Sequence, residues 1–214
     1  MATSDEPRLE DQHGSERQSR QSNNDQRRLD LDQKIRQEIL RLGDEGTPEE
    51  LRDFYNKHVE EYYELSELHQ YSIGCRALIE SLAEVVPDRS LRILDIGAGT
   101  GYAGKELRRL GYDNIDALDP AEGLLDIAKS QNIYQKYFLS YIFPDKKTII
   151  EDDSYDAACM AGAVVKGHIT MDCLPELMRI TKKGGVIIFN IGEHYLKPNL
   201  FFKFMIWKNA FRRL

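Results

Sequence analysis

LRILDIGAGTG, residues Leu91–Gly101, joins an apolar strand to a glycine-rich turn and to the start of a helix. The apolar residues before the turn predict a buried strand, and the residues after Gly101 have helical spacing. In units of this kind the glycines let a ligand approach backbone N–H groups at the start of the helix, because glycine has no Cβ. The stretch therefore predicts a parallel α/β sheet with a nucleoside-binding turn.

The glycines of this turn fit two ligand classes, depending on where the pattern begins. Gly99–Gly104 matches the dinucleotide pattern G-x-G-x-x-G, but its first glycine should follow the strand directly, and we expect the strand to end near Leu94. A carboxylate at the strand tip, Asp95, would repel a pyrophosphate but suits S-adenosylmethionine, which carries ammonium and sulfonium charges. The D-x-G-x-G-x-G register that starts at Asp95 is therefore favoured. An NAD(P)-dependent oxidoreductase remains the less favoured alternative.

A second acid supports nucleoside binding. Residues Asn114–Asp119 predict the next short strand, with Asp119 at its carboxyl end. The spacing from Gly101 is close to the ~20 residues expected of an acid that binds ribose hydroxyls. Both NAD and S-adenosylmethionine contain a ribose, so Asp119 indicates a nucleoside, and Asp95 makes the choice between the two.

The chain resembles the class I S-adenosylmethionine-dependent methyltransferases over residues 50–197. Leu91–Gly101 is similar to their first motif, and Ile115–Lys129 is similar to their second. Ser154–Ala158 is similar to their fourth-strand signature, and Leu174–Gly185 to the helix and turn before strand five. The resemblance implies S-adenosylmethionine as cofactor and a Rossmann-like methyltransferase fold.

Within that superfamily the chain most resembles the Williams–Beuren-region methyltransferase-like proteins. Gly162-Ala163 and Gly167-His168, ahead of the Leu-Pro-Glu-Leu run, carry this likeness. The cofactor-binding residues that the resemblance implies are Asp95, Gly97, Ala98, Gly99, Thr100, Gly101, Asp119, Pro120, Tyr62 and Ala161.

N-terminal lid helices are expected before the sheet. Thr47–Glu50 has the pattern of a capping box with proline in the first turn, which predicts a helix start. The resemblance to the family's lid segment carries over at Tyr55 and Tyr62, although Tyr62 could equally be an aromatic that packs on the core. The chain departs from that segment at Asn56, His58 and Tyr63. A further helix is expected over 71–86.

From residue 91 strands alternate with helices, which is typical of a doubly wound, mostly parallel α/β sheet. We expect strands near 91–95, 114–118, 137–140, 156–160 and 186–191, and helices near 101–110, 121–130 and 171–181. The family places an acid after the third strand to meet the adenine amine, and this chain has none there. Adenine recognition is then left to backbone groups or to Ser140 and Tyr141.

Composition limits the compartment and the partners. The net charge of −7 argues against a nucleic-acid surface, so no DNA binding is expected. The three cysteines have no C-x-x-C spacing, and the N-terminus lacks an apolar leader. No apolar run is long enough for a transmembrane segment. We therefore expect a cytoplasmic protein without a metal site, with each cysteine in the core.

Residues 1–46 are expected to form a disordered polar tail, because the first thirty contain few apolar side chains. Weak helical spacing is present from Asp30 to Leu42. The methyltransferase-like domain is expected over 47–214, with the lid helices in 47–88 and the cofactor-binding core in 89–214.

The C-terminal segment departs from the family. A class I methyltransferase normally follows strand five with a helix and a hairpin, and the residues after Gly192 suffice for a helix alone. We therefore expect the C-terminal hairpin strands to be lacking. Leu200–Leu214, aromatic and basic, could be a helix on the sheet, an interfacial membrane helix or the divergent end of a truncated product. The uncovered sheet edge would favour an edge-strand dimer.

The sequence assigns no catalytic residue. Methyl transfer depends mainly on proximity and orientation, and a base is needed only where the acceptor must lose a proton. Met160–His168 replaces the Asn/Asp-Pro-Pro-aromatic run of the enzymes that methylate amide or ring nitrogens, so that subclass is excluded. For His168, Glu193 and His194 a solvated or capping role is favoured over a role as base. The sequence predicts an S-adenosylmethionine-dependent methyltransferase with a small-molecule or protein acceptor, or else a catalytically silent or truncated methyltransferase-like protein.

Overall fold

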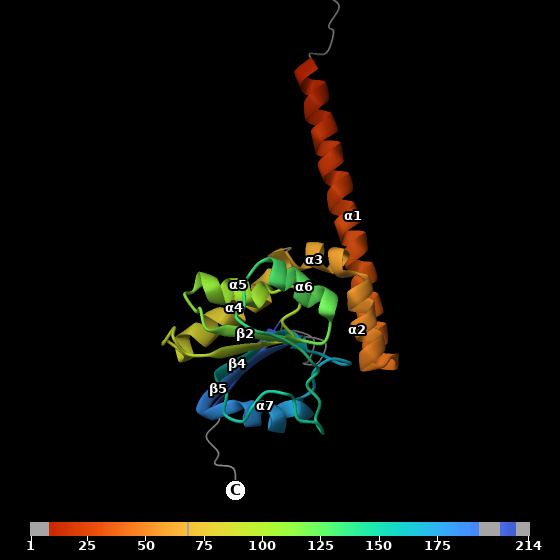
Figure 1. Ribbon diagram of the computed structural model, residues 1–214. Helices are drawn as coiled ribbons and strands as arrows, with labels where there is room; N and C mark the ends of the chain where they lie inside the picture. Colours follow the sequence, from red (N-terminus) through yellow and green to blue (C-terminus); the bar gives the residue numbers. More distant parts are fainter. Residues whose placement is uncertain (1–8, 68, 193–201, 209–214) are drawn as a thin grey trace, which may run out of the picture. The chain divides into compact units, whose positions relative to one another are not determined.

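The computed structural model describes residues 9–67, 69–192 and 202–208 (Figure 1). The chain divides into two compact units, residues 1–39 and 40–214. The candidate site lies entirely in the second unit.

Helix α1, Leu9–Glu45, covers most of the segment in which we expect disorder, so that expectation is wrong for the described residues. The segment is poor in apolar residues but rich in good helix formers, and side chains four apart pair along it. Gln26 Nε2 donates to Asp30, and Arg36 Nε pairs with Asp32 at 2.8 Å. Such local pairs stabilise a helix without a packed core.

Three further helices lie between α1 and the sheet. They are α2 (Pro48–Lys57), α3 (Val59–Ser66) and α4 (His69–Val85). The expected capping box is confirmed at the start of α2. Glu50 N donates to Thr47 Oγ1 at 3.2 Å, and Thr47 N donates to Glu50 Oε2 at 2.9 Å.

A six-stranded sheet forms the centre of the second unit, in the order β3-β2-β1-β4-β5-β6. Its strands are β1 (Ile93–Ile96), β2 (Ile115–Asp119), β3 (Tyr137–Leu139), β4 (Tyr155–Val164), β5 (Thr181–Gly192) and β6 (Phe202–Lys208). Strands β1 to β5 pair in parallel, which confirms the doubly wound α/β prediction. The intervening helices are α5 (Tyr102–Arg109), α6 (Glu122–Ser130) and α7 (Leu174–Ile180), with a short 3-10 turn, Met171–Cys173, before α7.

Strand β6 corrects the expectation that no strand follows β5. It pairs antiparallel with β5, from Val186 opposite Lys208 to Gly192 opposite Phe202. The aromatic and β-branched residues of this segment favour a strand over the helix that we expected. The edge of β5 is therefore paired, and the argument for an edge-strand dimer at β5 no longer holds.

Helices cover both faces of the sheet, with α4, α5 and α6 on one face and α7 on the other (Figure 1). Alternate residues of β1 face the two sides, so Ile93 lies in the core under α4 and α5, and Leu94 lies in the core over α7. All three cysteines are free and buried, as expected. The carboxyl ends of the five parallel strands, β1 to β5, lie at one common edge of the sheet, and the turns at that edge carry the candidate site.

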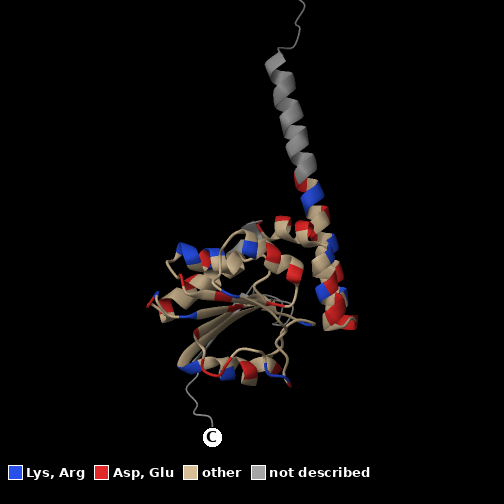
Figure 2. Cartoon of the chain, in the orientation of Figure 1, with Lys and Arg blue, Asp and Glu red and all other residues tan. Residues whose placement is uncertain are grey.

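Charged residues lie mainly on the helices. Lys and Arg are interspersed with Asp and Glu along α2 and α5 to α7, while the strands carry few charges (Figure 2). Within the described ranges, no helix combines the length and the apolar character needed to cross a membrane.

Candidate functional site

The glycine-rich turn leaves β1 directly after Ile96, two residues later than the sequence suggests. The backbone N–H groups of Gly97 and Ala98 both donate to Leu118 O, at 2.8 and 3.2 Å, so the turn is fastened to β2. Gly97 has a φ of +70°, and a Cβ added to it would lie 2.5 Å from Ala163 Cβ on β4. The first glycine after the strand is therefore Gly97. This supports the register that starts at Asp95 over the dinucleotide register that starts at Gly99.

Gly99 differs from the glycines on either side of it. A Cβ added to Gly99 would find no atom closer than 4.0 Å, where Leu124 Cδ1 and Tyr62 Cε1 lie. A Cβ added to Gly101 would lie 2.7 Å from Ile133 Cδ1, inside packed protein. Of these positions in the turn, Gly99 is the one that borders open space, in the manner of a backbone cradle for a ligand.

Asp119, at the end of β2, lies against this cradle. Gly99 N donates to Asp119 Oδ2 at 2.9 Å, and Ala121 N donates to Asp119 Oδ1 at 2.8 Å. The carboxyl is 7% exposed. Burial raises the pKa of Asp119 to about 6, although the two backbone donors act to lower it. The site thus holds an oriented carboxyl that is mostly ionised at neutral pH.

Asp95 is placed differently from our expectation. It is 1% exposed, and its side chain points into the core, where Tyr134 Oη donates to Oδ2 at 2.5 Å and Cys159 Sγ lies 3.8 Å from Oδ1. Burial raises the pKa of Asp95 to about 7, with the nearby charge of Asp119 acting in the same direction and the Tyr134 hydrogen bond against it. This geometry gives no support to our interpretation that the charge of Asp95 selects S-adenosylmethionine over a dinucleotide by direct contact. The carboxyl instead holds the base of the turn.

Tyr134 is a residue that sequence reasoning missed. Besides its bond to Asp95, its hydroxyl oxygen accepts from Gly104 N at 3.1 Å. A Cβ added to Gly104 would lie 2.4 Å from Tyr134 Cζ. The last glycine of the literal dinucleotide pattern is therefore required by the packing of Tyr134. The only sequence signal for this contact is the unexplained glycine itself.

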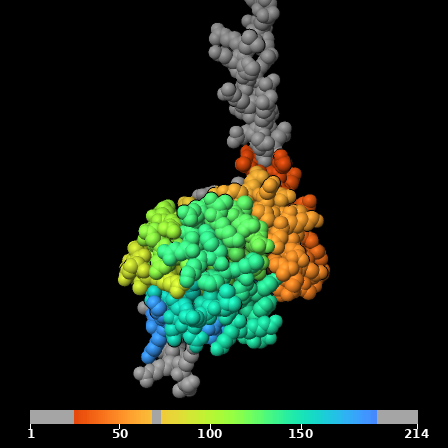
Figure 3. All heavy atoms as spheres, viewed as in Figure 1, coloured from red at the N-terminus to blue at the C-terminus, as the bar shows by residue number. Residues whose placement is uncertain are grey.

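Helices α2 and α3 are docked on α6 and on the glycine turn by side chains. Asn56 Oδ1 accepts from Gly123 N at 2.9 Å, which caps the start of α6 from another helix. Ser66 Oγ lies 3.0 Å from Thr100 Oγ1 in the glycine turn. Figure 3 shows α2 and α3, in orange, lying against the green surface of α6. Asn56, one of the departures from the family's lid segment, thus has a structural role.

Tyr62, from α3, lies beside the glycine turn, at 4.0 Å from the position of a Gly99 Cβ. Its ring meets that of Tyr55 edge to face, with centroids 5.0 Å apart. The structure therefore brings Tyr62 to the predicted site. Pro120 directly follows β2, Ala161 lies near the carboxyl end of β4, and both are partly exposed. Glu193 and His194 lie outside the described residues.

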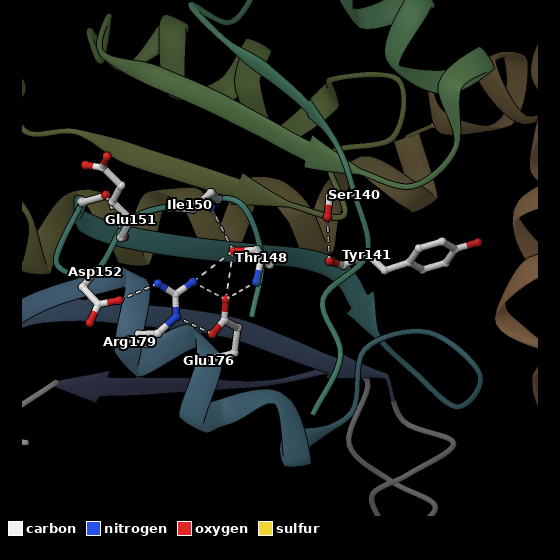
Figure 4. Close-up of polar contacts among 9 residues, drawn as sticks. Ser140, Tyr141, Thr148, Ile150, Glu151, Asp152, Glu176 and Arg179 are labelled. Atoms are coloured by element: carbon white, nitrogen blue, oxygen red, sulfur yellow. Dashed lines mark hydrogen bonds and ion pairs between the residues drawn. The ribbon is translucent and has the colours of Figure 1, made fainter. Parts of the chain in front are cut away.

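Ser140 and Tyr141, the side chains that we expect to recognise adenine, lie in the loop after β3. Ser140 Oγ donates to Tyr141 O at 3.0 Å (Figure 4). The Tyr141 hydroxyl lies 3.4 Å from Pro48 O on α2. Tyr141 thus points away from Ser140, and its ring stacks on Phe143 with centroids 5.0 Å apart. The structure does not bring the Ser140 and Tyr141 side chains together as one recognition element.

An ion-pair network fixes the far end of this loop to α7 (Figure 4). Arg179 Nε donates to Glu176 Oε2 at 2.6 Å, and its Nη1 donates to Asp152 Oδ1 at 2.6 Å. Glu176 Oε1 also accepts from Thr148 N at 2.7 Å. The Glu176 and Arg179 side chains are buried, so the network has a structural role in holding the loop.

The sequence pattern of the family described as "Methyltransferase domain" matches residues 94–189, which contain the turn and Asp119. Residues 94–189 thus match a methyltransferase domain, in agreement with the resemblance to the class I S-adenosylmethionine-dependent methyltransferases. Human methyltransferase-like protein 27 is 30% identical over 114 residues, which are 52% of this chain and 46% of that protein. This match confirms the resemblance to the Williams–Beuren-region proteins.

A bacterial enzyme and a solved structure are also similar to this chain. The malonyl-[acyl-carrier protein] O-methyltransferase of Serratia marcescens is 35% identical over 100 residues, or 46% of this chain and 37% of that enzyme. A crystal structure from Methanococcus maripaludis, provisionally described as an S-adenosylmethionine-dependent methyltransferase, aligns with a TM-score of 0.55 and 21% identity over 64% of each chain. This structure shows the fold. The matched segment spans less than half the length of these two curated relatives.

Proposed function

We propose that this chain transfers a methyl group from S-adenosylmethionine to a small-molecule or protein acceptor. The observation that carries the proposal is the bonding of Asp119, whose two oxygens each accept one backbone N–H, from Gly99 and Ala121. A carboxylate has about four acceptor positions. The remaining positions suit the two hydroxyls of a ribose.

The open space at Gly99 supports the same proposal. It lies between Tyr62 and Leu124 and next to the oxygen of Asp119 that Gly99 itself contacts. Backbone atoms there can approach a ligand that any side chain would displace. When bound, S-adenosylmethionine would supply a methyl group on a good leaving group, and the chain would supply proximity and orientation.

The proposed cofactor residues have different tasks. Asp119 would bind the ribose, and the backbone from Gly97 to Gly101, which includes Ala98 and Thr100, would follow the cofactor, with Tyr62 over the turn. Pro120 and Ala161 would border the cofactor at the ends of their strands. Asp95 would act through the position of the turn, by way of Tyr134. The free, buried cysteines support a reducing compartment such as the cytoplasm, and the net charge of −7 supports an acceptor other than DNA.

A thermal-shift series with S-adenosylhomocysteine, NAD and NADP tests the proposal. A ligand that binds only the folded state raises the melting temperature, so S-adenosylhomocysteine is expected to raise it and both dinucleotides to leave it unchanged. A shift with NAD alone would contradict the proposal. A shift with S-adenosylhomocysteine, without turnover of S-adenosylmethionine in protein or metabolite extracts, would favour the catalytically silent alternative.

A further inference from the structure

Tyr55 and His168 come from distant parts of the chain and meet beside the glycine turn. Tyr55, on α2, has its hydroxyl oxygen 2.7 Å from His168 Nε2, in the loop after β4. The other ring nitrogen, Nδ1, lies 3.2 Å from Lys166 O. A carbonyl oxygen can only accept, so Nδ1 carries the hydrogen and Nε2 presents its lone pair to the Tyr55 hydroxyl. The hydrogen-bond network thus assigns one tautomer to His168.

The loop that carries His168 is held by close backbone packing. Gly167 has a φ of +80°, and a Cβ added to it would lie 2.4 Å from Gly43 Cα near the end of α1. His168 N donates to Val165 O at 3.0 Å, which closes the loop on itself. Burial lowers the pKa of His168 below its ordinary value, so the imidazole is neutral at pH 7.

The charged groups near this loop neutralise one another. Lys166 Nζ pairs with Asp44 Oδ1 at 2.5 Å, and both side chains are exposed. From α2, the group that faces the imidazole is the Tyr55 hydroxyl, with ring centroids 5.7 Å apart. Tyr55 and His168 are each partly exposed, so a ligand from solvent can reach the pair.

The fold places this pair on the methyl-donor side of the site. In the sheet, β2 and β3 lie on one side of β1, and β4 and β5 lie on the other. The strand order therefore reverses between β1 and β4, and ligands of doubly wound sheets bind at this topological switch point. Because the ribose acid Asp119 ends β2, the methionine end of the cofactor would lie toward β4. The His168 loop starts from Ala163 and returns at Ile169, and both of these residues lie against Gly97.

We infer that Tyr55 and His168 form a proton-accepting pair for an acceptor that must lose a proton, and that the acceptor atom is a hydroxyl oxygen or a protonated amine nitrogen. The inference rests on the proposed methyl transfer. The Tyr55 oxygen takes the proton of the acceptor while the Tyr55 proton passes to His168 Nε2. The acceptor's lone pair then forms the bond to the methyl carbon, the carbon–sulfur bond breaks, and its electron pair stays on sulfur. The imidazolium later returns its proton to solvent.

Two conservative variants and a matched control test the pair. Methyl transfer is followed with tritiated S-adenosylmethionine and separate protein and small-metabolite extracts, and the labelled products are analysed for the atom that carries the methyl group. His168→Gln and Tyr55→Phe are expected to lower the rate at pH 7 by about 10²-fold, within the range of general base catalysis. His58→Gln, at the junction of α2 and α3, is expected to leave the rate unchanged.

The pH profile separates a proton-accepting role from a structural one. The wild-type rate should rise with pH and level off above the pKa of His168, whereas the His168→Gln rate should keep rising as hydroxide removes the acceptor's proton. Binding of S-adenosylhomocysteine should be the same in all variants. In the protein without ligands, imidazole ¹⁵N shifts should show a neutral ring with hydrogen on Nδ1 at pH 7.

The possible failures are distinguishable. Equal loss at every pH, an unchanged rate in His168→Gln, a methylated carbon or sulfur, or an imidazolium at pH 7 would each overturn the inference and leave the proposed function standing. Absence of any methylated product from the wild-type chain would overturn both.

Discussion

Gly99 and Asp119 are joined by a hydrogen bond of 2.9 Å, from the backbone nitrogen of the turn to Oδ2 of the carboxyl at the end of β2. This bond holds the two elements that a nucleoside needs, a side-chain-free backbone and an acid, at a fixed separation. The proposed ribose site is therefore formed by contact between neighbouring strand ends.

Three glycine substitutions separate folding from binding in the turn. Gly97, Gly99 and Gly184 all have positive φ, so alanine is strained at each by about 1–2 kcal/mol. At Gly184 nothing lies within 4 Å of an added Cβ, which makes Gly184→Ala the control for strain alone. Gly97→Ala should cost more stability than this control, because its Cβ would lie 2.5 Å from Ala163 Cβ.

Gly99→Ala should instead match the control in stability and lose affinity for S-adenosylhomocysteine by at least about tenfold, about 1.4 kcal/mol. Urea unfolding and isothermal titration measure the two effects. Equal affinities in Gly99→Ala and Gly184→Ala would show that Gly99 does not border the ligand.

The buried carboxyl of Asp95 makes stability depend on pH. Its pKa is raised to about 7 in the folded chain from an ordinary value of 3.8, so the folded state keeps a proton that the unfolded chain has lost. The stability from this group is therefore complete below pH 3.8 and is lost as pH rises through about 7. The free energy of unfolding of wild type minus Asp95→Asn should fall over this range, by up to about 1.4 kcal/mol per pH unit. A difference that rises with pH between pH 5 and 7 would contradict the account.

A partly buried ion pair between Arg92 and Asp116 of β2 should contribute to stability. Arg92 Nη2 lies 2.7 Å from Asp116 Oδ2, which also accepts from the Tyr155 hydroxyl at 2.8 Å, and the Asp116 side chain is 1% exposed. Arg92→Met leaves that carboxylate without its cation and should cost about 3 kcal/mol. The double variant Arg92→Met/Asp116→Leu should recover part of the loss, because it removes the unpaired charge, although the buried Tyr155 hydroxyl then loses its acceptor.

Denaturant unfolding of the single and double variants checks this prediction. The control is Lys129→Met, an exposed change on α6 that should alter the free energy of unfolding little. A double variant no more stable than Arg92→Met would show that the cost does not come from the unpaired charge.

Much of the cofactor side was predictable from local pattern. The apolar run of β1, the glycines after it and the acid at the end of β2 follow one another in sequence, and Thr47 with Glu50 forms the capping box that the spacing predicts. These features depend on neighbours a few residues apart.

The features that sequence reasoning missed depend on distant contacts. Tyr134 reaches Asp95 from the loop after α6, and Asn56 reaches Gly123 from another helix. Neither partner can be chosen from spacing alone. The side chains of β1 alternate between the two faces of the sheet, and this alternation directs the Asp95 side chain into the core, although its position at the end of the strand suggested a contact with ligand. Strand β6 was missed because its partner strand, rather than local helix-like spacing, determines its conformation.

Titration of S-adenosylhomocysteine into the wild-type chain, Asp119→Asn and Asp126→Asn, at pH 5.5 and pH 7.5, tests the central claim most directly. The ribose hydroxyls donate to the ionised carboxyl, and the pKa of Asp119 is raised to about 6, so wild-type affinity should increase between the two pH values. Asp119→Asn should bind at least about tenfold more weakly at pH 7.5 and lose this increase, with Asp126→Asn behaving as wild type. Equal affinity of wild type and Asp119→Asn at both pH values would contradict a ribose site at Asp119.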